Sequence, residues 1–303
     1  MIDICLLGSC GMMPLPGGRW LSCVLLRCGS TLTLFDCGEG TQIPWKSLGW
    51  GFRQLGAICF THMHADHVAG LPGVLFMGAH AGRTEPLHIY GPAGTIYVIE
   101  GLRRIVPELP FPVQIHEITS GTSFPLPGEL RGSCVAASHG IPCLAYRVEL
   151  ERGAAFQPEQ AQALGLPVQY WSRLQHGETV EFNGQIITPS QVLGPSRRGI
   201  SFAFITDTRP TQELSTFVRD VDLLVCESMY DDPADLSLAR ANAHMLAEEA
   251  ARLARRAGVH ELILTHFSPK ITDPSRAERA ARQVFANTRA GRDGMVVTLA
   301  YST

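Results

Sequence analysis

Three histidines and an aspartate crowd into six consecutive positions of this sequence. The run His62-Met63-His64-Ala65-Asp66-His67 comes directly after the apolar segment 57–60, whose composition predicts a buried strand. We expect His62 and His64 to point to one side of the chain, while Asp66 and His67 begin a helix and face a second point. That spacing suits two metal ions a few ångströms apart, because one short loop then supplies ligands to both. A core histidine or a functionless His-rich loop is the alternative, but neither explains four such groups after a buried strand.

Further ligand types follow later predicted strands. His139 comes after the strand predicted at 134–137, Asp207 after the one at 201–205, and His266 after the one at 261–264. Residues at strand ends are held by the sheet while their side chains reach a loop-lined cleft, as a rigid site requires. Taken singly, each has an ordinary interpretation, and Asp207 could simply cap a helix over 208–218. Beside the first motif, we expect all three to join the same site.

The rest of the chain alternates short apolar runs with helix-like stretches, which predicts a layered α/β fold. Predicted strands cover residues 2–7, 22–27, 32–35, 57–60, 86–90, 113–118, 134–137, 143–148, 201–205, 222–226, 261–264 and 295–299. Helices are expected after His67, Gly91, Asp207 and Asp273. The strongest helix prediction runs over 239–257, with apolar positions three and four residues apart and Gly258 at its end.

Segment 150–194 differs from the rest, because it is polar, turn-rich and weakly periodic, with a short helix predicted near 154–164. We interpret it as an arm inserted into a single domain that spans residues 1–303. An ordinary long surface connection is the alternative.

Composition narrows the classes of function. Hydrophobic residues make up 45% of the chain, enough for a large core, yet no stretch approaches the ~20 unbroken apolar residues of a membrane span. Nine cysteines, several inside apolar runs, indicate free buried thiols and therefore a cytoplasmic location. The net charge of −3 excludes a uniformly basic coat for nucleic acid, so a polyanion would have to meet a local patch.

Several motifs resemble one known family. The first motif is typical of the metallo-β-lactamase superfamily. The runs Phe35-Asp36-Cys37-Gly38-Glu39-Gly40-Thr41-Gln42 and Leu264-Thr265-His266-Phe267-Ser268-Pro269 resemble ribonuclease Z, the family of tRNA 3′-processing endonucleases. The resemblance runs from Ile4 to about Val297. It implies an αββα sandwich with an inserted arm, a homodimer, and precursor tRNA as the partner.

The resemblance also implies a ligand set and a reaction. One metal would be held by His62, His64, His139 and a bridging Asp207, and the other by Asp66, His67, Asp207 and His266. Two Zn²⁺ per chain are expected, and ligands of nitrogen and oxygen alone leave Mn²⁺ or iron open. A water between two such ions loses a proton near neutral pH and can attack a phosphodiester, leaving a 3′-hydroxyl and a 5′-phosphate. The family gives Asp66 a part in handling that proton.

His244 is the last predicted catalytic residue. The family places a histidine just before a helix, where it contacts the scissile phosphate or protonates the leaving oxygen, with an upstream acid in support that matches Glu227. Here the sequence continues Met245-Leu246, whereas the family usually has hydroxyl residues. From position alone, a half-buried helix histidine is the alternative.

The arm departs from the family pattern. It lacks the lysine-rich Gly-Pro tip by which the family grips tRNA, and over residues 150–200 four arginines balance four glutamates. Tyr170, Trp171 and Arg173 are the candidate RNA-binding residues, because aromatic rings stack on bases. The alternative is an aromatic patch that packs the arm down or against a second subunit.

Two functions other than tRNA cleavage are alternatives for a chain with these motifs. The altered arm favours a metal-dependent phosphodiesterase for small phosphodiesters such as cyclic nucleotides, whereas the two family runs favour RNA. A scaffold that binds RNA without cutting it would have lost ligands, and this chain keeps all seven.

Overall fold

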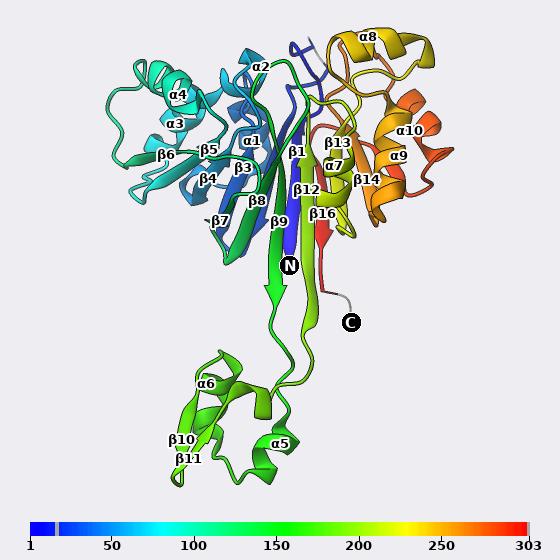
Figure 1. Ribbon diagram of the computed structural model, residues 1–303. Helices are drawn as coiled ribbons and strands as arrows, with labels where there is room; N and C mark the ends of the chain where they lie inside the picture. Colours follow the sequence, from blue (N-terminus) through cyan, green and yellow to red (C-terminus); the bar gives the residue numbers. More distant parts are fainter. Residues whose placement is uncertain (16–17, 302–303) are drawn as a thin grey trace. The chain divides into compact units, whose positions relative to one another are not determined.

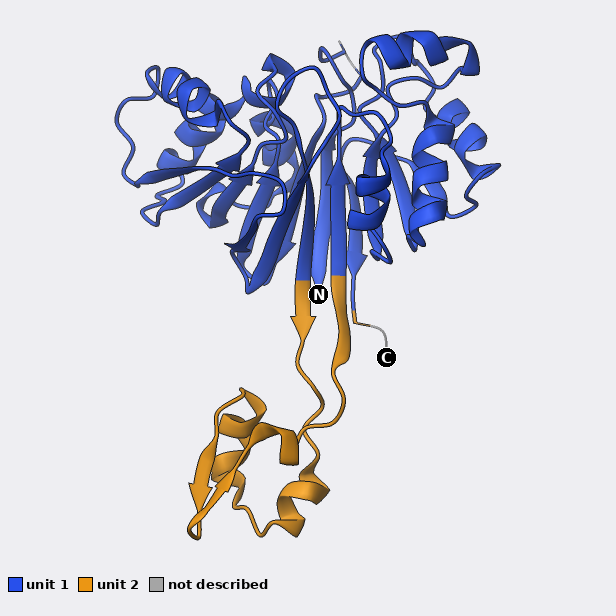
Figure 2. Cartoon of the chain, viewed as in Figure 1, with its two compact units in different colours: residues 1–149, 201–300 blue, residues 150–200, 301–303 orange. Residues whose placement is uncertain are grey.

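The chain forms two compact units in the computed structural model, which describes residues 1–15 and 18–301. Unit 1 comprises Met1–Glu149 and Ser201–Ala300, and unit 2 comprises residues 150–200 with Tyr301 (Figure 2). Among the described residues, no helix has both the length and the apolar character needed to cross a bilayer.

Unit 1 contains two mixed sheets, each with seven strands among the described residues. The first has the order β16-β1-β2-β3-β4-β5-β6. Its strands are Ile2–Gly8 (β1), Cys23–Cys28 (β2), Thr31–Phe35 (β3), Leu55–Cys59 (β4), Leu87–Gly91 (β5), Val113–Glu117 (β6) and Met295–Leu299 (β16). Strands β3 to β6 run parallel, whereas β1 pairs antiparallel with both β2 and β16.

The second sheet has the order β15-β14-β13-β12-β9-β8-β7. Its strands are Ser123–Leu126 (β7), Leu130–Ala136 (β8), Leu144–Arg152 (β9), Arg197–Ile205 (β12), Leu223–Glu227 (β13), Glu261–Thr265 (β14) and Thr288–Ala290 (β15). Strands β12 to β15 run parallel, so their carboxyl ends meet at one edge of the sheet.

Helices cover the outer face of each sheet (Figure 1). The first sheet carries Gln42–Leu48 (α1), Phe52–Gln54 (η1), Ala65–Val68 (α2), Leu71–His80 (α3) and Thr95–Arg103 (α4). The second carries Gln212–Phe217 (α7), Ala247–Ala257 (α9) and Ser275–Arg282 (α10), while Pro233–Asp235 (η4) and Leu236–Ala241 (α8) lie beyond the end of that sheet. Between the sheets, the buried ring of Phe35 contacts Tyr146, Phe202 and Phe204. These four layers confirm the αββα sandwich.

Unit 2 has a small core of its own. It contains Pro158–Ala163 (α5), Val168–Tyr170 (η2), Trp171–Gln175 (α6), the hairpin Val180–Phe182 (β10) and Gln185–Ile187 (β11), and Pro189–Gln191 (η3). Buried Ala161, Leu174 and Val180 lie at its centre.

The sequence predictions located most of the sheet elements and missed shorter ones. The two edge strands β7 and β15 and the helix α1 had no predicted counterpart, and the helix predicted at 239–257 is wrong at residues 242–246. The amphipathic pattern runs through 239–257, but the structure has two helices, α8 and α9, separated by residues 242–246. Ala243 in that loop has a left-handed backbone, with φ of 56°. The helix predicted near 154–164 is shorter and begins at Pro158.

Candidate metal centre

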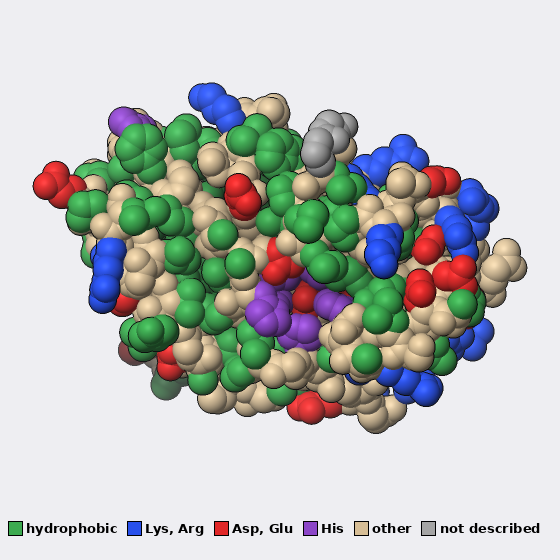
Figure 3. Space-filling model, turned by 90° about the horizontal axis from the view of Figure 1, so that it is seen from above, with side chains coloured by type: hydrophobic (Ala, Val, Ile, Leu, Met, Phe, Trp, Pro, Cys, Tyr) green, Lys and Arg blue, Asp and Glu red, His purple; other side chains and the backbone are tan. Residues whose placement is uncertain are grey.

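The predicted ligands meet at one end of the sandwich, where the strands of both sheets stop. His62 follows β4, His139 follows β8, Asp207 follows β12 and His266 follows β14. Figure 3 looks onto this end and shows histidine side chains gathered around a hollow, with carboxylates beside them and apolar side chains around the rim.

One ligand group is made of His62, His64, His139 and Asp207. His62 Nε2 lies 2.9 Å from His64 Nδ1, and His139 Nε2 lies 3.3 Å from the same atom. Asp207 Oδ2 lies 3.7 Å from His62 Nε2 and 3.9 Å from His139 Nε2. Three imidazole nitrogens and one carboxylate oxygen thus converge on a point, which is the donor set of a four-coordinate metal site.

A second group is made of Asp66, His67 and His266. Asp66 Oδ2 lies 3.5 Å from His67 Nε2 and 3.7 Å from His266 Nε2. The other oxygen of Asp207, Oδ1, completes the group at 3.4 Å from His67 Nε2 and 3.1 Å from His266 Nε2. Asp207 therefore offers one oxygen to each group and is placed to bridge two cations.

Two nitrogen atoms of the second group are suited to bind a metal ion. His67 Nε2 and His266 Nε2 are buried and have no hydrogen-bond partner among the described residues. A buried polar atom without a partner costs about 1–3 kcal/mol, so such atoms call for a ligand. Imidazole and carboxylate donors suit zinc, manganese or iron, and the residues present fit a bound divalent cation.

Charge and backbone strain both concentrate here. Burial raises the pKa of Asp207, but the imidazoles of His266, His67 and His62 outweigh burial and hold that pKa well below its usual range. Burial likewise raises the pKa of Asp66, and the neighbouring imidazoles of His266 and His67 outweigh burial and hold that pKa low.

Asp207 and His266 have left-handed backbones, with φ of 44° and 56°. Non-glycine residues in that region cluster at functional sites, where the surrounding structure holds them.

Asp36 supports the centre, and its functional role was missed in the sequence. It directly follows β3, is fully buried, and accepts hydrogen bonds from His67 Nδ1 at 2.8 Å and from the Thr61 backbone N–H at 2.8 Å. Its carboxylate thus orients His67 so that Nε2 faces the second group. The available signal was the position of Asp36 at the end of the strand next to β4.

Backbone contacts from neighbouring loops fix the position of Asp66. The backbone N–H of Met12 donates to Asp66 Oδ2 at 2.9 Å. A Cβ at Gly70 would lie 1.9 Å from the carbonyl oxygen of Gly38. The loop after β3 and the turn after α2 therefore pack backbone to backbone, which requires glycine and fixes α2, the helix that carries Asp66 and His67.

His244 lies just before α9 and outside any helix, although the helix predicted over 239–257 includes it. It lies in the loop 242–246, with Nδ1 3.1 Å from Glu227 Oε2 and Nε2 3.9 Å from Asp207 Oδ2. Glu227 also accepts the Met245 N–H at 3.0 Å, so one carboxylate fixes both the ring and the peptide after it. Burial lowers the pKa of His244, while the Glu227 and Asp207 carboxylates raise it to about 9.

The candidate RNA-binding residues belong to unit 2 and contribute to its core. Trp171 contacts Phe156 and donates its indole N–H to the Leu166 carbonyl, and Tyr170 contacts Phe182. Arg173 is 53% exposed and pairs with Glu178.

Comparisons with known proteins identify the family of this chain. The family model of the beta-lactamase superfamily domain matches residues 31–173 and 143–267. The protein named ribonuclease Z of Lachnoclostridium phytofermentans is 42% identical over 301 residues, 99% of each chain. This chain belongs to the ribonuclease Z family. A second ribonuclease Z, from Agathobacter rectalis, is 42% identical over 304 residues and again covers 99% of each chain.

Solved structures share the fold. The short form of human tRNase Z superposes with a TM-score of 0.70 at 22% identity, covering 98% of each chain. The metallo-β-lactamase fold protein YhfI of Bacillus subtilis superposes with a TM-score of 0.69 at 20% identity, with the same coverage. These likenesses confirm the fold expected from the ribonuclease Z motifs.

Proposed function

We propose that this protein is a metal-dependent endoribonuclease that cuts precursor tRNA near its 3′ end and leaves a 3′-hydroxyl and a 5′-phosphate. The observation that carries the proposal is Asp207, whose two oxygens face two separate ligand groups in a member of this family. Full-length relatives at about 40% identity that are named ribonuclease Z favour this function over hydrolysis of small phosphodiesters.

We propose two zinc ions per chain, with Mn²⁺ or iron as substitutes that the same donors accept. The first would be held by His62, His64, His139 and Asp207, and the second by Asp66, His67, Asp207 and His266. When bound, such cations activate a water molecule and offset the charge that develops on the phosphoryl oxygens.

Asp66 and His244 are the residues proposed to move protons. The Met12 N–H and the neighbouring imidazoles hold Asp66 ionised at the centre, where it can accept the proton of the attacking water. Glu227 fixes His244 Nδ1, which leaves Nε2 turned toward Asp207 and free to give a proton to the leaving oxygen. His244→Ala should therefore lower kcat by ~10²–10⁴ without changing metal content.

Unit 2 is proposed as the tRNA-binding arm, with Tyr170, Trp171 and Arg173 as contact residues. Both aromatic rings remain partly exposed although they pack in the arm, and a half-exposed guanidinium can reach a phosphate. Replacing residues 153–196 by a short Gly-Ser linker keeps every proposed ligand. That variant should cleave bis-p-nitrophenyl phosphate normally and show a raised KM for precursor tRNA. An unchanged KM would mean that the arm does not bind tRNA.

A homodimer and a cytoplasmic location complete the proposal. Exposed apolar side chains gather on α3, on α4 and just after it, including Phe76, Tyr97 and Ile105, which are 53%, 86% and 74% exposed. Such a patch is typical of a subunit interface, so Tyr97→Asp should shift the mass measured by light scattering from dimer to monomer. All nine cysteines are free thiols, which suits a reducing compartment.

The deciding experiment compares wild type with Asp207→Ala on precursor tRNA and on bis-p-nitrophenyl phosphate, with mapping of the RNA ends and metal analysis. We expect cleavage near the 3′ end by wild type, and loss of both activities and of metal in the variant, because each group loses a ligand. Full activity in metal-stripped protein would contradict the mechanism. Activity on the small ester alone would contradict the substrate.

A further inference from the structure

The loop that carries His244 adopts a backbone conformation that its own residues do not favour. The loop spans residues 242–246, has no glycine or proline, and includes Ala243 in a left-handed backbone. Such a conformation costs of order 1–3 kcal/mol for a residue other than glycine. Contacts from outside the loop must therefore fix it, and Glu227 holds the His244 ring and the Met245 N–H.

A partly buried ion pair between Arg209 and Glu249 contacts the main chain of the loop. Arg209 Nη1 donates to the His244 carbonyl oxygen and, at 2.8 Å, to Glu249 Oε2, while Arg209 Nη2 donates to Glu249 Oε1. The two side chains are only 19% and 11% exposed. A bidentate pair with this little solvent access is directional and far less screened than a surface pair.

Glu249 also caps the N-terminus of α9. Its Oε2 accepts the Leu246 N–H at 3.0 Å, so the last peptide of the loop is tied to the first turn of the helix. Leu246 has no hydroxyl or carboxylate with which to cap the helix, and Glu249 supplies the negative charge that a helix N-terminus favours. One carboxylate thus anchors both Arg209 and the end of the loop.

The backbone of Arg209 is itself fixed beside two proposed ligands. It lies two residues after Asp207, and its backbone N–H donates to the Ser138 carbonyl oxygen at 3.0 Å, next to His139. The guanidinium therefore reaches the His244 loop from a backbone that is fixed relative to the centre.

We propose that Arg209 and Glu249 form a positioning pair that sets the place of the His244 imidazole relative to Asp207. This inference rests on the proposed function for the role of His244. The pair touches no proposed ligand side chain, and it acts through the main chain of residues 244 and 246. A misplacement of about 1 Å lowers catalysis by up to ~10²-fold, and this sets the scale of the expected effect.

The test is a double-mutant cycle on the holoenzyme. Arg209→Ala should lower kcat about 10- to 100-fold with KM and metal content near wild type, and Arg209→Lys should recover part of the loss. In the His244→Ala background, Arg209→Ala should change kcat less than about threefold, because a positioning residue has nothing left to position. The milder Glu249→Gln should behave in the same way, and it serves if Arg209→Ala unfolds.

A matched control exists on the same helix. Arg252 and Glu248 in α9 form an exposed pair at 3.2 Å, one turn apart, and contact no loop residue in the described interactions. Glu248→Gln should leave kcat unchanged. Equal, independent losses from Arg209→Ala in both backgrounds would overturn the proposal, as would loss of metal, since either result would mean that the pair supports the fold or the ligands.

A readout without turnover separates this inference from the proposed function. The ring signals of His244 in a ¹H–¹⁵N spectrum, assigned by their absence in His244→Ala, should move or broaden in Glu249→Gln and stay unchanged in Glu248→Gln. If precursor tRNA is not cut, the spectrum still decides, because it needs no substrate. Ring signals that are identical in wild type and Glu249→Gln would refute the positioning role.

Discussion

Asp36→Asn is the substitution for which the structure gives the sharpest expectation. Asp36 Oδ1 accepts the Thr61 N–H at 2.8 Å, and Oδ2 accepts His67 Nδ1–H at 2.8 Å. Asparagine has the same shape and tolerates the left-handed backbone at φ of 58°, so the fold should survive. Its carbonyl oxygen must stay on the Thr61 side, where the donor is a peptide. The amide NH₂ then faces His67 Nδ1 and forces the ring proton onto Nε2.

That tautomer is wrong for a ligand, because Nε2 needs its lone pair to bind a cation. Loss of such a supporting carboxylate typically weakens metal binding 10- to 100-fold. At about 1.4 kcal/mol per tenfold change, this is about 1.4–2.8 kcal/mol. A charge-assisted hydrogen bond contributes about 1.5–3 kcal/mol, so the two routes to the magnitude agree.

The assay is zinc competition against a chromogenic chelator, starting from metal-free protein. We expect the group of Asp66, His67 and His266 to lose affinity 10- to 100-fold. Asp3→Asn is the matched control, because Asp3 also accepts hydrogen bonds from a cation, Arg27, but lies on β1 at 16% side-chain exposure, outside both ligand groups. Wild-type affinity in Asp36→Asn would refute the tautomer argument.

Three further predictions follow from packing and burial. A Cβ at Gly11 would lie 2.6 Å from His266 Cε1, so Gly11→Ala should displace that ring and lower zinc content measured by mass spectrometry; an unaltered content would contradict this. Gly101 lies inside α4 with open space around it, and Gly101→Ala should raise the free energy of unfolding by about 0.5–1 kcal/mol in urea titrations; an unchanged value would contradict this. Burial raises the pKa of Cys10 and of Cys134 to about 11, so both stay thiols below that pH, and native protein at pH 8 should react with Ellman's reagent far more slowly than unfolded protein.

The strands and the proposed ligands were predictable for one physical reason. His139, Asp207 and His266 each follow an apolar run that must become a buried strand, so the sequence alone predicts that they lie at one edge of the sheet. The αββα layers then followed from the order of strands and helices.

The loop that carries His244 was not predictable in the same way. Residues 239–257 have an unbroken amphipathic pattern, and the helix is interrupted by partners distant in sequence, namely Glu227 and Arg209. Asp36 was overlooked because a single aspartate after a strand has many ordinary explanations. Its hydrogen bond to His67, 31 residues away, appears only in three dimensions.

The left-handed backbones at Asp207 and His266 set stability against activity. Glycine or asparagine would relax these positions and remove a buried charge or an unpartnered ring, so a metal-free protein should gain stability from losing the groups that bind metal. Selection for heat resistance without added metal would therefore favour inactive variants at both positions. A thermostable form of this enzyme has to be sought with metal present, where ligand binding adds to the stability of the folded state and reverses that preference.

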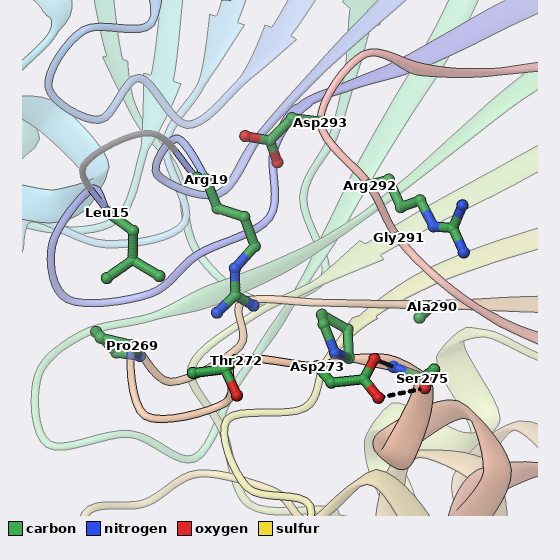
Figure 4. Close-up of a pocket in the computed structure, with 12 residues that line it drawn as sticks. Leu15, Arg19, Pro269, Thr272, Asp273, Ser275, Ala290, Gly291, Arg292 and Asp293 are labelled. Atoms are coloured by element: carbon green, nitrogen blue, oxygen red, sulfur yellow. Dashed lines mark hydrogen bonds between the residues drawn. The ribbon is translucent and has the colours of Figure 1, made fainter.

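A cavity in unit 1 is lined by residues outside the proposed ligand groups. It has a volume of about 590 Å³ and is lined by Arg19, Asp273, Arg292 and Asp293 among others (Figure 4). Asp293 lies within its wall and accepts hydrogen bonds from Ser9 and the Trp20 N–H. Substitutions in this lining that keep the Asp293 hydrogen bonds would change stability without removing a proposed metal ligand, unlike substitutions at Asp207 or His266.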